Sequence, residues 1–410
     1  MNTTTFSNIP TPFYLYDTDL LRTTLSTLQT EVQKYDNYHV HYAVKANANP
    51  KLLPDILAAG LGIDCVSGGE IRTVLNAGFP ADKIVFAGVG KQDWEINLAL
   101  EAEIFAFNVE SVPELEVISQ LAAKQGKTAN ICLRINPNVG AHTHELITTG
   151  RAEDKFGIDM RDMQKVITMT HTLPHLRLRG LHFHIGSQIL EMDDFVQLAH
   201  RINELQDQLE QMGWAVEVIN VGGGLGIDYD NPNANPIPNF RDYFAVWHQH
   251  LKLRQGQSLH CELGRAIVGQ CGSLITRVLY VKEGYDQHYV IVDGGMTELI
   301  RPALYGAKHK VENISQTQNL RLTDWLFPVE NTAVYDVVGP ICESSDEFGC
   351  DLCLPVTRRG DILAIRSAGA YGEAMASCYN CRPLPVGYTI EDIENDMFNK
   401  DEGLESTRNE

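Results

Sequence analysis

Short apolar runs alternate with longer amphipathic segments from about residue 38 to residue 265. Runs of about four to eight mostly apolar residues are typical of buried strands. Between them, apolar residues recur at every third or fourth position, as in Ser111–Lys124 and Met192–Met212, and this period predicts helices. Eight strands are predicted in this way: Val40–Lys45, Gly62–Ser67, Lys83–Ala87, Ile104–Val109, Asn130–Asn136, Leu178–Ile185, Val216–Gly222 and Ser258–Gly264.

Eight strand–helix units over about 230 residues predict an α/β fold, a (β/α)8 barrel of the TIM type. The active site of such a barrel lies at the carboxyl ends of its strands. A doubly wound sheet is the alternative, and it would place a glycine-rich turn after the first strand. That position holds Lys45, and the glycines instead follow the seventh strand, at Gly222–Gly226. We therefore expect the barrel.

The pattern changes after Cys271, where short alternating strands are separated by Gly, Pro and Asn. This texture predicts a second, mostly β domain. The strand-like Thr11–Tyr16 precedes the barrel and could pair with that domain. We place the barrel at residues 26–270 and the β domain at residues 1–25 and 271–410. Its clearest strands are Leu274–Tyr280, Tyr289–Val292, Ala333–Val338 and Asp361–Ile365.

Charge and composition narrow the partners. The 410 residues carry a formal net charge of -20, which argues against nucleic acid or an anionic membrane as partner, because both would be repelled. No apolar run of about 18 residues and no basic, then apolar, amino-terminal segment indicates a membrane span or a secretory signal. Nine cysteines, an odd number in a long chain, indicate reduced thiols. We expect a cytoplasmic protein.

The first predicted strand ends at Lys45, just before the turn-rich segment Ala46–Pro50. A lysine at a strand end is most often simply solvated. Alternatively, its amine is presented to a pocket, where it could form a Schiff base. The chemistry of the neighbouring strand ends decides between these interpretations.

Strands six and seven end in residues that suit a pocket. By strand alternation, His182 and His184 point to the same side. A structural role is equally consistent with His182, whereas His184, followed by a glycine and Ser187, favours a pocket. The glycines of Gly222–Gly226 form either a tight turn or a group of exposed backbone N–H donors for an anion. Barrels commonly bind phosphate beside strands seven and eight, which favours the anion.

Strand eight ends in Glu262 and Arg265. A carboxylate and a guanidinium three residues apart can be a surface ion pair of little energetic value. In a pocket, Glu262 could instead keep a ring nitrogen protonated while Arg265 faces an anionic group. Together with Lys45 and the glycine turn, these residues describe a site for pyridoxal 5'-phosphate: a Schiff base, a phosphate cradle and a pyridinium partner.

Six sequence motifs resemble, in their residues and in their order along the chain, those of the pyridoxal phosphate-dependent decarboxylases with the alanine racemase fold (fold type III). The resemblance extends over nearly all of Thr11–Pro383. One departure is Leu263, where the family usually has proline; a rigid turn residue is lost, but no reactive group. The motifs are Tyr42–Asn47, His182–Gln188, Gly222–Gly226, Glu262–Arg265, Cys342–Asp346 and Ala368–Tyr371.

The resemblance implies a role for each candidate residue. Lys45 would hold the cofactor as a Schiff base, Glu262 would pair with the pyridine nitrogen, and His184 would stack on the ring. The residues that would hold the phosphate are Ser187, Gly224, Gly264, Arg265 and Tyr371. Three further residues match supporting positions: Asp64, Glu70 and Arg134.

The resemblance also implies decarboxylation of meso-2,6-diaminopimelate to L-lysine and CO2 in a homodimer with shared active sites. Cys342 would reach in from the second subunit and return a proton to the α-carbon, although most free cysteines are only small buried apolar residues. The substrate would be bound by Arg265, Arg301, Tyr305, Glu343 and Tyr371.

Some of these residues also discriminate between the proposed reaction and its alternatives. Arg301 and Tyr305 would bind a distal carboxylate, which ornithine lacks. A related decarboxylase of ornithine, arginine or carboxynorspermidine is the alternative enzyme, and these two residues argue against it. A non-catalytic binding protein would be expected to lose Lys45 or Cys342, and the chain keeps both.

Two C-x-x-C pairs remain outside this scheme. Cys350 with Cys353 and Cys378 with Cys381 have a spacing that suits a structural zinc site. The family pattern does not require these thiols. We therefore predict no metal.

Overall fold

The computed structural model describes residues 9–138, 155–315, 321–324 and 331–395. The chain divides into two compact units. One comprises Thr24–Ile227 and Pro238–Ile267, and the other comprises Met1–Thr23, Asp228–Ile237 and Val268–Glu410. The segment Asp228–Ile237 contains no strand or helix of its own, so the sequence pattern gave no sign that it lies with the second unit.

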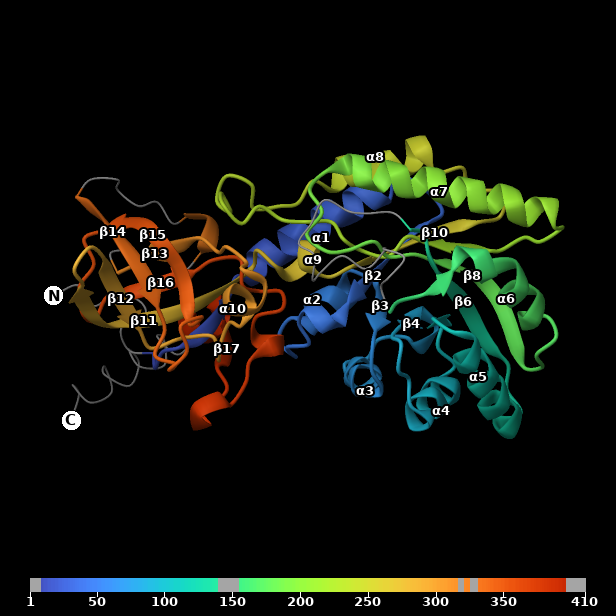
Figure 1. Ribbon diagram of the computed structural model, residues 1–410, viewed down its shortest axis with the longest axis horizontal. Coiled ribbons are helices and arrows are strands. Elements are labelled where there is room, and N and C mark those ends of the chain that lie inside the picture. Colours follow the sequence, from blue (N-terminus) through green and yellow to red (C-terminus); the bar gives the residue numbers. More distant parts are fainter. Residues whose placement is uncertain (1–8, 139–154, 316–320, 325–330, 396–410) are drawn as a thin grey trace, which may run out of the picture. The chain divides into compact units, whose positions relative to one another are not determined.

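Parallel strands close into an eight-stranded barrel within the described part of the first unit (Figure 1). Their order is β5-β4-β3-β2-β10-β9-β8-β6, and β6 returns to pair with β5. This closure confirms the predicted (β/α)8 barrel, because a doubly wound sheet keeps two open edges. The strands are β2 (Tyr38–Ala43), β3 (Gly62–Cys65), β4 (Ile84–Phe86), β5 (Ala106–Val109), β6 (Ala129–Asn136), β8 (Leu176–His182), β9 (Val218–Asn220) and β10 (Ser258–Leu263), with the short β7 (Ile158–Asp159) beside β6.

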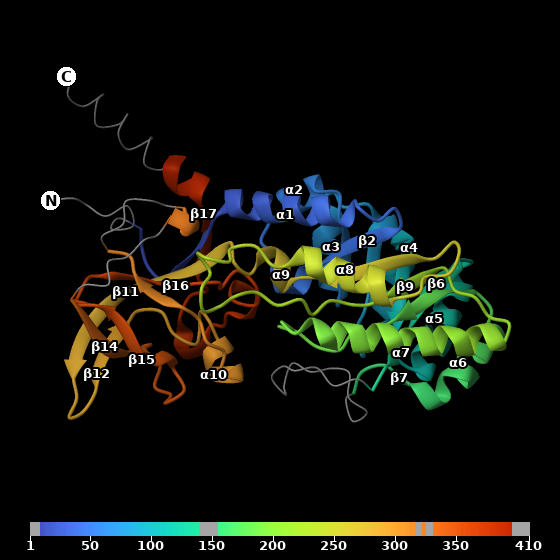
Figure 2. The ribbon, with the colours of Figure 1, turned by 90° about the horizontal axis from the view of Figure 1, so that it is seen from above.

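Helices lie outside the barrel, and α7 and α8 pack side by side (Figures 1 and 2). The two amphipathic segments form α5 and α7, as predicted. Ser111 begins α5 by accepting a hydrogen bond from the Glu114 N–H, a typical helix cap. Of the described helices, none is long and apolar enough to cross a bilayer. The helices are α1 (Thr18–Val32), α2 (Leu53–Ala58), α3 (Gly68–Asn76), α4 (Asp93–Ala102), α5 (Val112–Gln125), α6 (Met163–Thr170), α7 (Met192–Gln211), α8 (Phe240–His250) and α9 (Arg265–Val268).

Six of the eight barrel strands end one to three residues earlier than predicted, and two of these ends matter for the site. β2 stops at Ala43, and Lys45 lies in one turn of 3-10 helix, Val44–Ala46. The apolar run continues through Val44, so alternation alone could not locate the stop. β8 stops at His182, which leaves His184 beyond the strand. Both Lys45 and His184 are therefore presented from turns at the carboxyl end of the barrel.

The second unit is mostly β, as predicted. β1 (Phe13–Tyr16) pairs with β11 in antiparallel register, which confirms that the amino-terminal strand joins this unit. The sheet order is β13-β16-β11-β12-β14-β15, and β1 also pairs with β17. The other elements are β11 (Gly272–Glu283), β12 (His288–Val292), β13 (Val311–Asn313), β14 (Thr332–Val338), β15 (Glu347–Pro355), β16 (Ile362–Ile365), β17 (Val386–Thr389) and the short helix α10 (Arg301–Tyr305).

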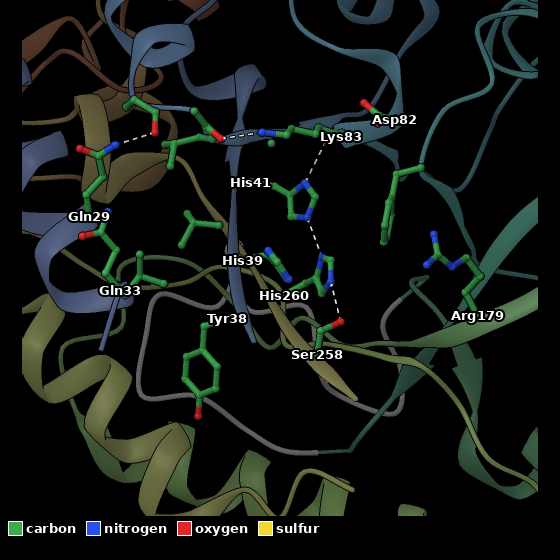
Figure 3. Close-up of a pocket in the computed structure, with 17 residues that line it drawn as sticks. Gln29, Gln33, Tyr38, His39, His41, Asp82, Lys83, Arg179, Ser258 and His260 are labelled. Atoms are coloured by element: carbon green, nitrogen blue, oxygen red, sulfur yellow. Dashed lines mark hydrogen bonds between the residues drawn. The ribbon is translucent and has the colours of Figure 1, made fainter. Parts of the chain in front are cut away.

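A pocket of about 500 Å³ lies at the amino-terminal end of the barrel, where three histidines meet (Figure 3). His41 Nδ1 lies 3.2 Å from the Lys83 carbonyl oxygen, and His41 Nε2 lies 2.8 Å from His260 Nδ1. A carbonyl only accepts, so His41 donates from Nδ1 and accepts from His260 at Nε2. A Cβ on Gly62 would lie 2.4 Å from His41 Nδ1, so a glycine is needed there to admit the ring.

This histidine pair should make the fold sensitive to acid. Burial lowers the pKa of His41 to about 4, whereas an unfolded histidine has a pKa near 6.5. Between these values the unfolded chain binds more protons, so stability falls as the pH decreases from 6.5 toward 4. His41→Asn keeps a donor for the Lys83 carbonyl but cannot titrate. Between pH 7 and pH 5, the unfolding free energy of His41→Asn should therefore decrease by about 2 kcal/mol less than that of the wild type.

Urea unfolding of the wild type and of His41→Asn at both pH values measures this difference. His39→Asn is the comparison at a more exposed histidine of the same pocket; burial and the charge of Lys83 also lower the pKa of His39, so this variant should remove a smaller part of the pH dependence. An identical pH dependence in wild type and His41→Asn would show that His41 does not titrate in this range.

Candidate active site

The carboxyl ends of the barrel strands bring Lys45 and the buried Asp64 together. Lys45 Nζ lies 3.1 Å from Asp64 Oδ2, and the other oxygen, Oδ1, has no hydrogen-bond partner among the described residues. Burial, reinforced by the charge of Glu262, raises the pKa of Asp64 to about 7, although Lys45 opposes this. Near neutral pH, the Asp64 carboxyl can therefore hold or release a proton beside the amine.

Glu262, on β10, is buried and receives three hydrogen bonds. Asn220 Nδ2 and Asn108 Nδ2 donate to Oε1 over 2.7 and 2.9 Å. His182 Nε2 lies 3.0 Å from Oε2. Burial alone would raise the pKa of Glu262, but the charge and hydrogen bond of His182 and the charge of Lys45 hold it well below its usual range. Glu262 is thus an ionised carboxylate in an apolar barrel.

The glycine turn after β9 has no room for side chains. A Cβ on Gly222 would lie 2.3 Å from the Phe183 carbonyl oxygen, and one on Gly223 would lie 2.1 Å from that of Glu262. Gly224 has a φ of 113°, in the region that favours glycine. His184 Nδ1 accepts a hydrogen bond from the Gly223 N–H over 3.2 Å, which fixes the imidazole against the turn.

Arg265 and Ser187 meet beside this turn, as the predicted phosphate site requires. Arg265 donates to Ser187 Oγ from Nε over 3.3 Å and from Nη2 over 2.9 Å. A Cβ on Gly264 would lie 3.0 Å from the Cβ of Ala46, so the exit of β10 passes close to the turn that carries Lys45. A guanidinium beside a hydroxyl is a suitable pair of donors for a phosphate group.

These observations fit pyridoxal phosphate. The barrel offers an amine at Lys45 and a stably ionised carboxylate at Glu262. It also offers a glycine turn in which any added Cβ would collide with neighbouring backbone atoms. The amine follows β2, the carboxylate lies on β10, and the candidate phosphate-binding donors follow β8, β9 and β10, all on one rim. Each of the three chemical parts of the cofactor therefore has a suitable partner within this unit.

The supporting positions are also ordered. Arg134 Nη1 donates to Glu110 Oε1 over 3.0 Å, and its guanidinium lies 4.7 Å from the centre of the Phe156 ring. Glu70 accepts a hydrogen bond from the Val66 N–H over 2.7 Å. Glu110 and Glu70 therefore hold segments at the strand ends of the barrel.

In the second unit, Arg301 is buried in α10 and held by His309. Arg301 Nη1 lies 2.7 Å from His309 Nε2, and His309 Nδ1 lies 2.8 Å from the Arg366 carbonyl oxygen. The guanidinium also lies 5.0 Å from the centre of the Tyr229 ring. Tyr305 ends the same helix, one turn after Arg301, and is partly buried. Arg301 therefore has a fixed position on the β unit.

The Cys342–Asp346 motif lies in a loop of the same unit. Cys342 is a free, exposed thiol, and Glu343 accepts a hydrogen bond from Tyr379 Oη over 2.9 Å. Tyr379 stands between the cysteines of the second C-x-x-C pair. We had considered that pair only as a metal site, so the sequence reasoning missed the tyrosine.

The remaining thiols and Tyr371 complete the predicted set. Cys350 and Cys353 lie on β15, and all nine cysteines are free. Among the residues that the structure describes, no three His, Cys, Asp or Glu side chains are placed to hold a metal ion. Tyr371 is partly buried and has a φ of 57°, which is uncommon for a residue other than glycine and is typical of functional loops.

The sequence reasoning also missed Asn108 and Asn220, and it left His182 open between a structural and a functional role. These three residues share one signal: each is polar and buried in the carboxyl-terminal half of a barrel strand. Burying a polar group without a partner is costly, so such residues indicate a shared partner within a barrel. That partner is Glu262.

Comparisons with known proteins identify the family. Residues 21–269 match the family described as the pyridoxal binding domain of the pyridoxal-dependent decarboxylases. The chain is 62% identical over 388 residues to the diaminopimelate decarboxylase of Bacteroides thetaiotaomicron, covering 95% of this chain and 97% of that protein. It is 39% identical over 400 residues to the Helicobacter pylori (strain J99) diaminopimelate decarboxylase, covering 98% of this chain and 95% of that protein.

Solved structures agree. The Helicobacter pylori diaminopimelate decarboxylase complexed with L-lysine has a TM-score of 0.86 and 36% identity, covering 97% of this chain and 98% of that chain. The M. jannaschii enzyme, also with L-lysine, has a TM-score of 0.82 and 33% identity, covering 93% and 88%. Similarity of this degree over nearly the whole length shows that the chain belongs to the pyridoxal phosphate-dependent diaminopimelate decarboxylases.

Proposed function

We propose that this chain removes one carboxyl group from meso-2,6-diaminopimelate and releases L-lysine and CO2, the last step of lysine biosynthesis. The observation that carries the proposal is the barrel rim, where the Lys45–Asp64 pair and the ionised Glu262 accompany a phosphate-binding turn. The names of the relatives support this substrate, and two solved relatives hold L-lysine, the expected product.

Release of CO2 from four candidate substrates tests the proposal. Purified enzyme supplied with pyridoxal phosphate should release CO2 from meso-diaminopimelate with a kcat/KM far above that for ornithine, arginine or carboxynorspermidine. A preference for one of these three would replace the proposal by the alternative decarboxylase. No release from any of them would favour a binding protein.

The residues that the sequence motifs indicate would hold the cofactor. Lys45 would bind it covalently through its amine, Glu262 would face the ring nitrogen, and His184 would lie against the ring. The phosphate would be bound by Ser187, Gly224, Gly264 and Arg265 from the barrel and by Tyr371 from the β unit. When bound, pyridoxal phosphate supplies a sink for the electron pair that stays behind as CO2 departs.

Two groups would manage the protons. Lys45 is the acid–base group beside the α-carbon, and Asp64, whose pKa burial raises to about 7, can exchange a proton with it. Cys342 would return a proton to the α-carbon after CO2 has left.

The β unit would supply substrate recognition and the subunit interface. We assign residues 26–270 to cofactor binding and residues 1–25 and 271–410 to substrate and partner contacts. Cys342 and Glu343 are exposed, as expected if they serve the site of a second copy in a homodimer. We also infer a cytoplasmic location, since nine free thiols suit a reducing compartment.

Arg301 and Tyr305 would bind the distal carboxylate, together with Arg265, while Glu343 and Tyr371 complete the substrate contacts. Arg301→Met should lower kcat/KM for diaminopimelate by about 10²- to 10³-fold, because a buried charge partner of the substrate is lost. Steady-state kinetics measures this, with Arg359→Met as the control at an exposed arginine of the same unit. Equal losses in both variants would remove Arg301 from substrate recognition.

A further inference from the structure

The three donors on Glu262 leave one acceptor position open. An ionised carboxylate accepts about four hydrogen bonds, two at each oxygen. Oε1 already accepts from Asn220 and Asn108, and Oε2 accepts from His182. The remaining position is therefore on Oε2, beside the imidazole.

The orientation of the Asn220 amide is fixed independently. Its Oδ1 accepts a hydrogen bond from the Gly222 N–H over 2.9 Å. A backbone N–H can only donate, so the oxygen must face Gly222 and the Nδ2 group must face Glu262. Glu262 Oε1 thus receives a donor whose position is set by the glycine turn, and Oε1 is not the oxygen left for the cofactor.

His182 makes its hydrogen bond to Glu262 and to no other described residue. Its side chain is buried, and Nδ1 has no hydrogen-bond partner within the described ranges. A histidine retained for packing would either bond both ring nitrogens or be replaced by an apolar residue without cost. The one described hydrogen bond of the imidazole is with the Glu262 carboxylate, so its effect is on that carboxylate.

Asp64 provides the comparison within the same barrel. It is as buried as Glu262, but its one described hydrogen bond is with Lys45, and the pKa of its carboxyl is raised to about 7. Glu262 has three donors, and its pKa is lowered. Neighbouring carboxyl groups with pKa values shifted in opposite directions take different chemical roles. Glu262 therefore differs from Asp64 in its hydrogen-bond donors and not in its burial, and these donors keep Glu262 ionised.

We propose that His182 is a positioning residue, which keeps Glu262 ionised and leaves one acceptor position on Glu262 Oε2 for the pyridine N–H of the cofactor. This inference rests on the proposed function. It adds that His182 controls the protonation of the cofactor ring through Glu262, without touching the substrate.

The ¹⁵N chemical shift of the pyridine nitrogen tests this directly, in holoenzyme loaded with pyridoxal phosphate labelled at that nitrogen. The wild type should give the shift of a protonated pyridinium. His182→Leu removes the donor and should move the shift toward neutral pyridine. His182→Gln keeps an N–H donor near the position of Nε2 and should restore the pyridinium shift.

Kinetics should follow the same order. Loss of a supporting residue of this kind costs about 10- to 100-fold, so kcat of His182→Leu should fall by about this factor while KM changes little. The glutamine variant should recover most of the rate. Thermal unfolding of each holoenzyme separates this loss of rate from general destabilisation, because destabilisation would not depend on whether residue 182 carries an N–H donor.

A pyridinium shift in His182→Leu would overturn the inference, as would equal rates in the leucine and glutamine variants. If the leucine variant does not retain cofactor, His182→Asn replaces it, because the shorter amide does not reach Oε2. Failure of the wild type itself to take up the labelled cofactor would instead refute the proposed function. The two failures are therefore distinguishable.

Discussion

Lys45→Ala protein should form no covalent Schiff base with pyridoxal phosphate, and its decarboxylation rate should fall by about 10⁴-fold. The amine of Lys45 is the proposed covalent attachment point, and it lies 3.1 Å from Asp64 at the carboxyl end of β2. Removing it takes away both the attachment and the acid–base group. The visible absorption band of the holoenzyme, and the cofactor that stays covalently attached to the protein after borohydride reduction and denaturation, measure the loss.

Lys51→Ala is the matched control, because Lys51 is an exposed lysine in the same loop region. It should keep the band and most of the rate. A Lys45→Ala protein that still retains the cofactor covalently after borohydride reduction and denaturation would place the attachment at another lysine, and the interpretation of the first strand end would be wrong.

Cys342→Ala should bind cofactor normally yet lose about 10²- to 10⁴-fold in turnover, the range expected when a general acid is removed. The exposed thiol is the proposed proton donor to the α-carbon. Cofactor absorbance and steady-state CO2 release on the same sample separate the two effects. Cys353→Ala, at another exposed thiol of the same unit, should behave as the wild type. Near-normal turnover of Cys342→Ala would exclude the thiol from the reaction.

The same variant tests whether active sites are shared. Inactive Lys45→Ala and Cys342→Ala proteins should regain activity when mixed and exchanged, because a mixed dimer has one site with both groups. At equal amounts the recovery should approach about a quarter of the wild-type rate, since half of the dimers are mixed and each has one intact site. No recovery would mean that each subunit uses its own cysteine, or that the subunits do not exchange, which size-exclusion analysis of tagged mixtures tells apart.

The architecture of the chain was predictable where the hydrophobic period was strong. The eight barrel strands and helices α5 and α7 follow it directly. Strand ends were less predictable: the apolar run extends through Val44, whereas β2 stops at Ala43. β13 and β17 were missed because they are only three and four residues long, and β15 (Glu347–Pro355) was missed because its nine residues have no clear alternation.

The candidate site was predictable where a residue type is chemically distinctive. Lysine, histidine, glutamate and a glycine cluster at strand ends indicated the cofactor, and Arg265 and Ser187 do meet. Residues that act through a neighbour gave no such signal. Asn220 and Tyr379 have ordinary side chains, and only the three-dimensional contacts to Glu262 and Glu343 assign them a role.

Asn220 links the two ends of the proposed cofactor site. Its amide oxygen holds the Gly222 N–H of the phosphate-binding turn, and its amide nitrogen holds Glu262. One short side chain therefore fixes the distance between the glycine turn and the Glu262 carboxylate. A displacement of the turn would therefore move the Asn220 amide, and with it the hydrogen bond that positions the Glu262 carboxylate.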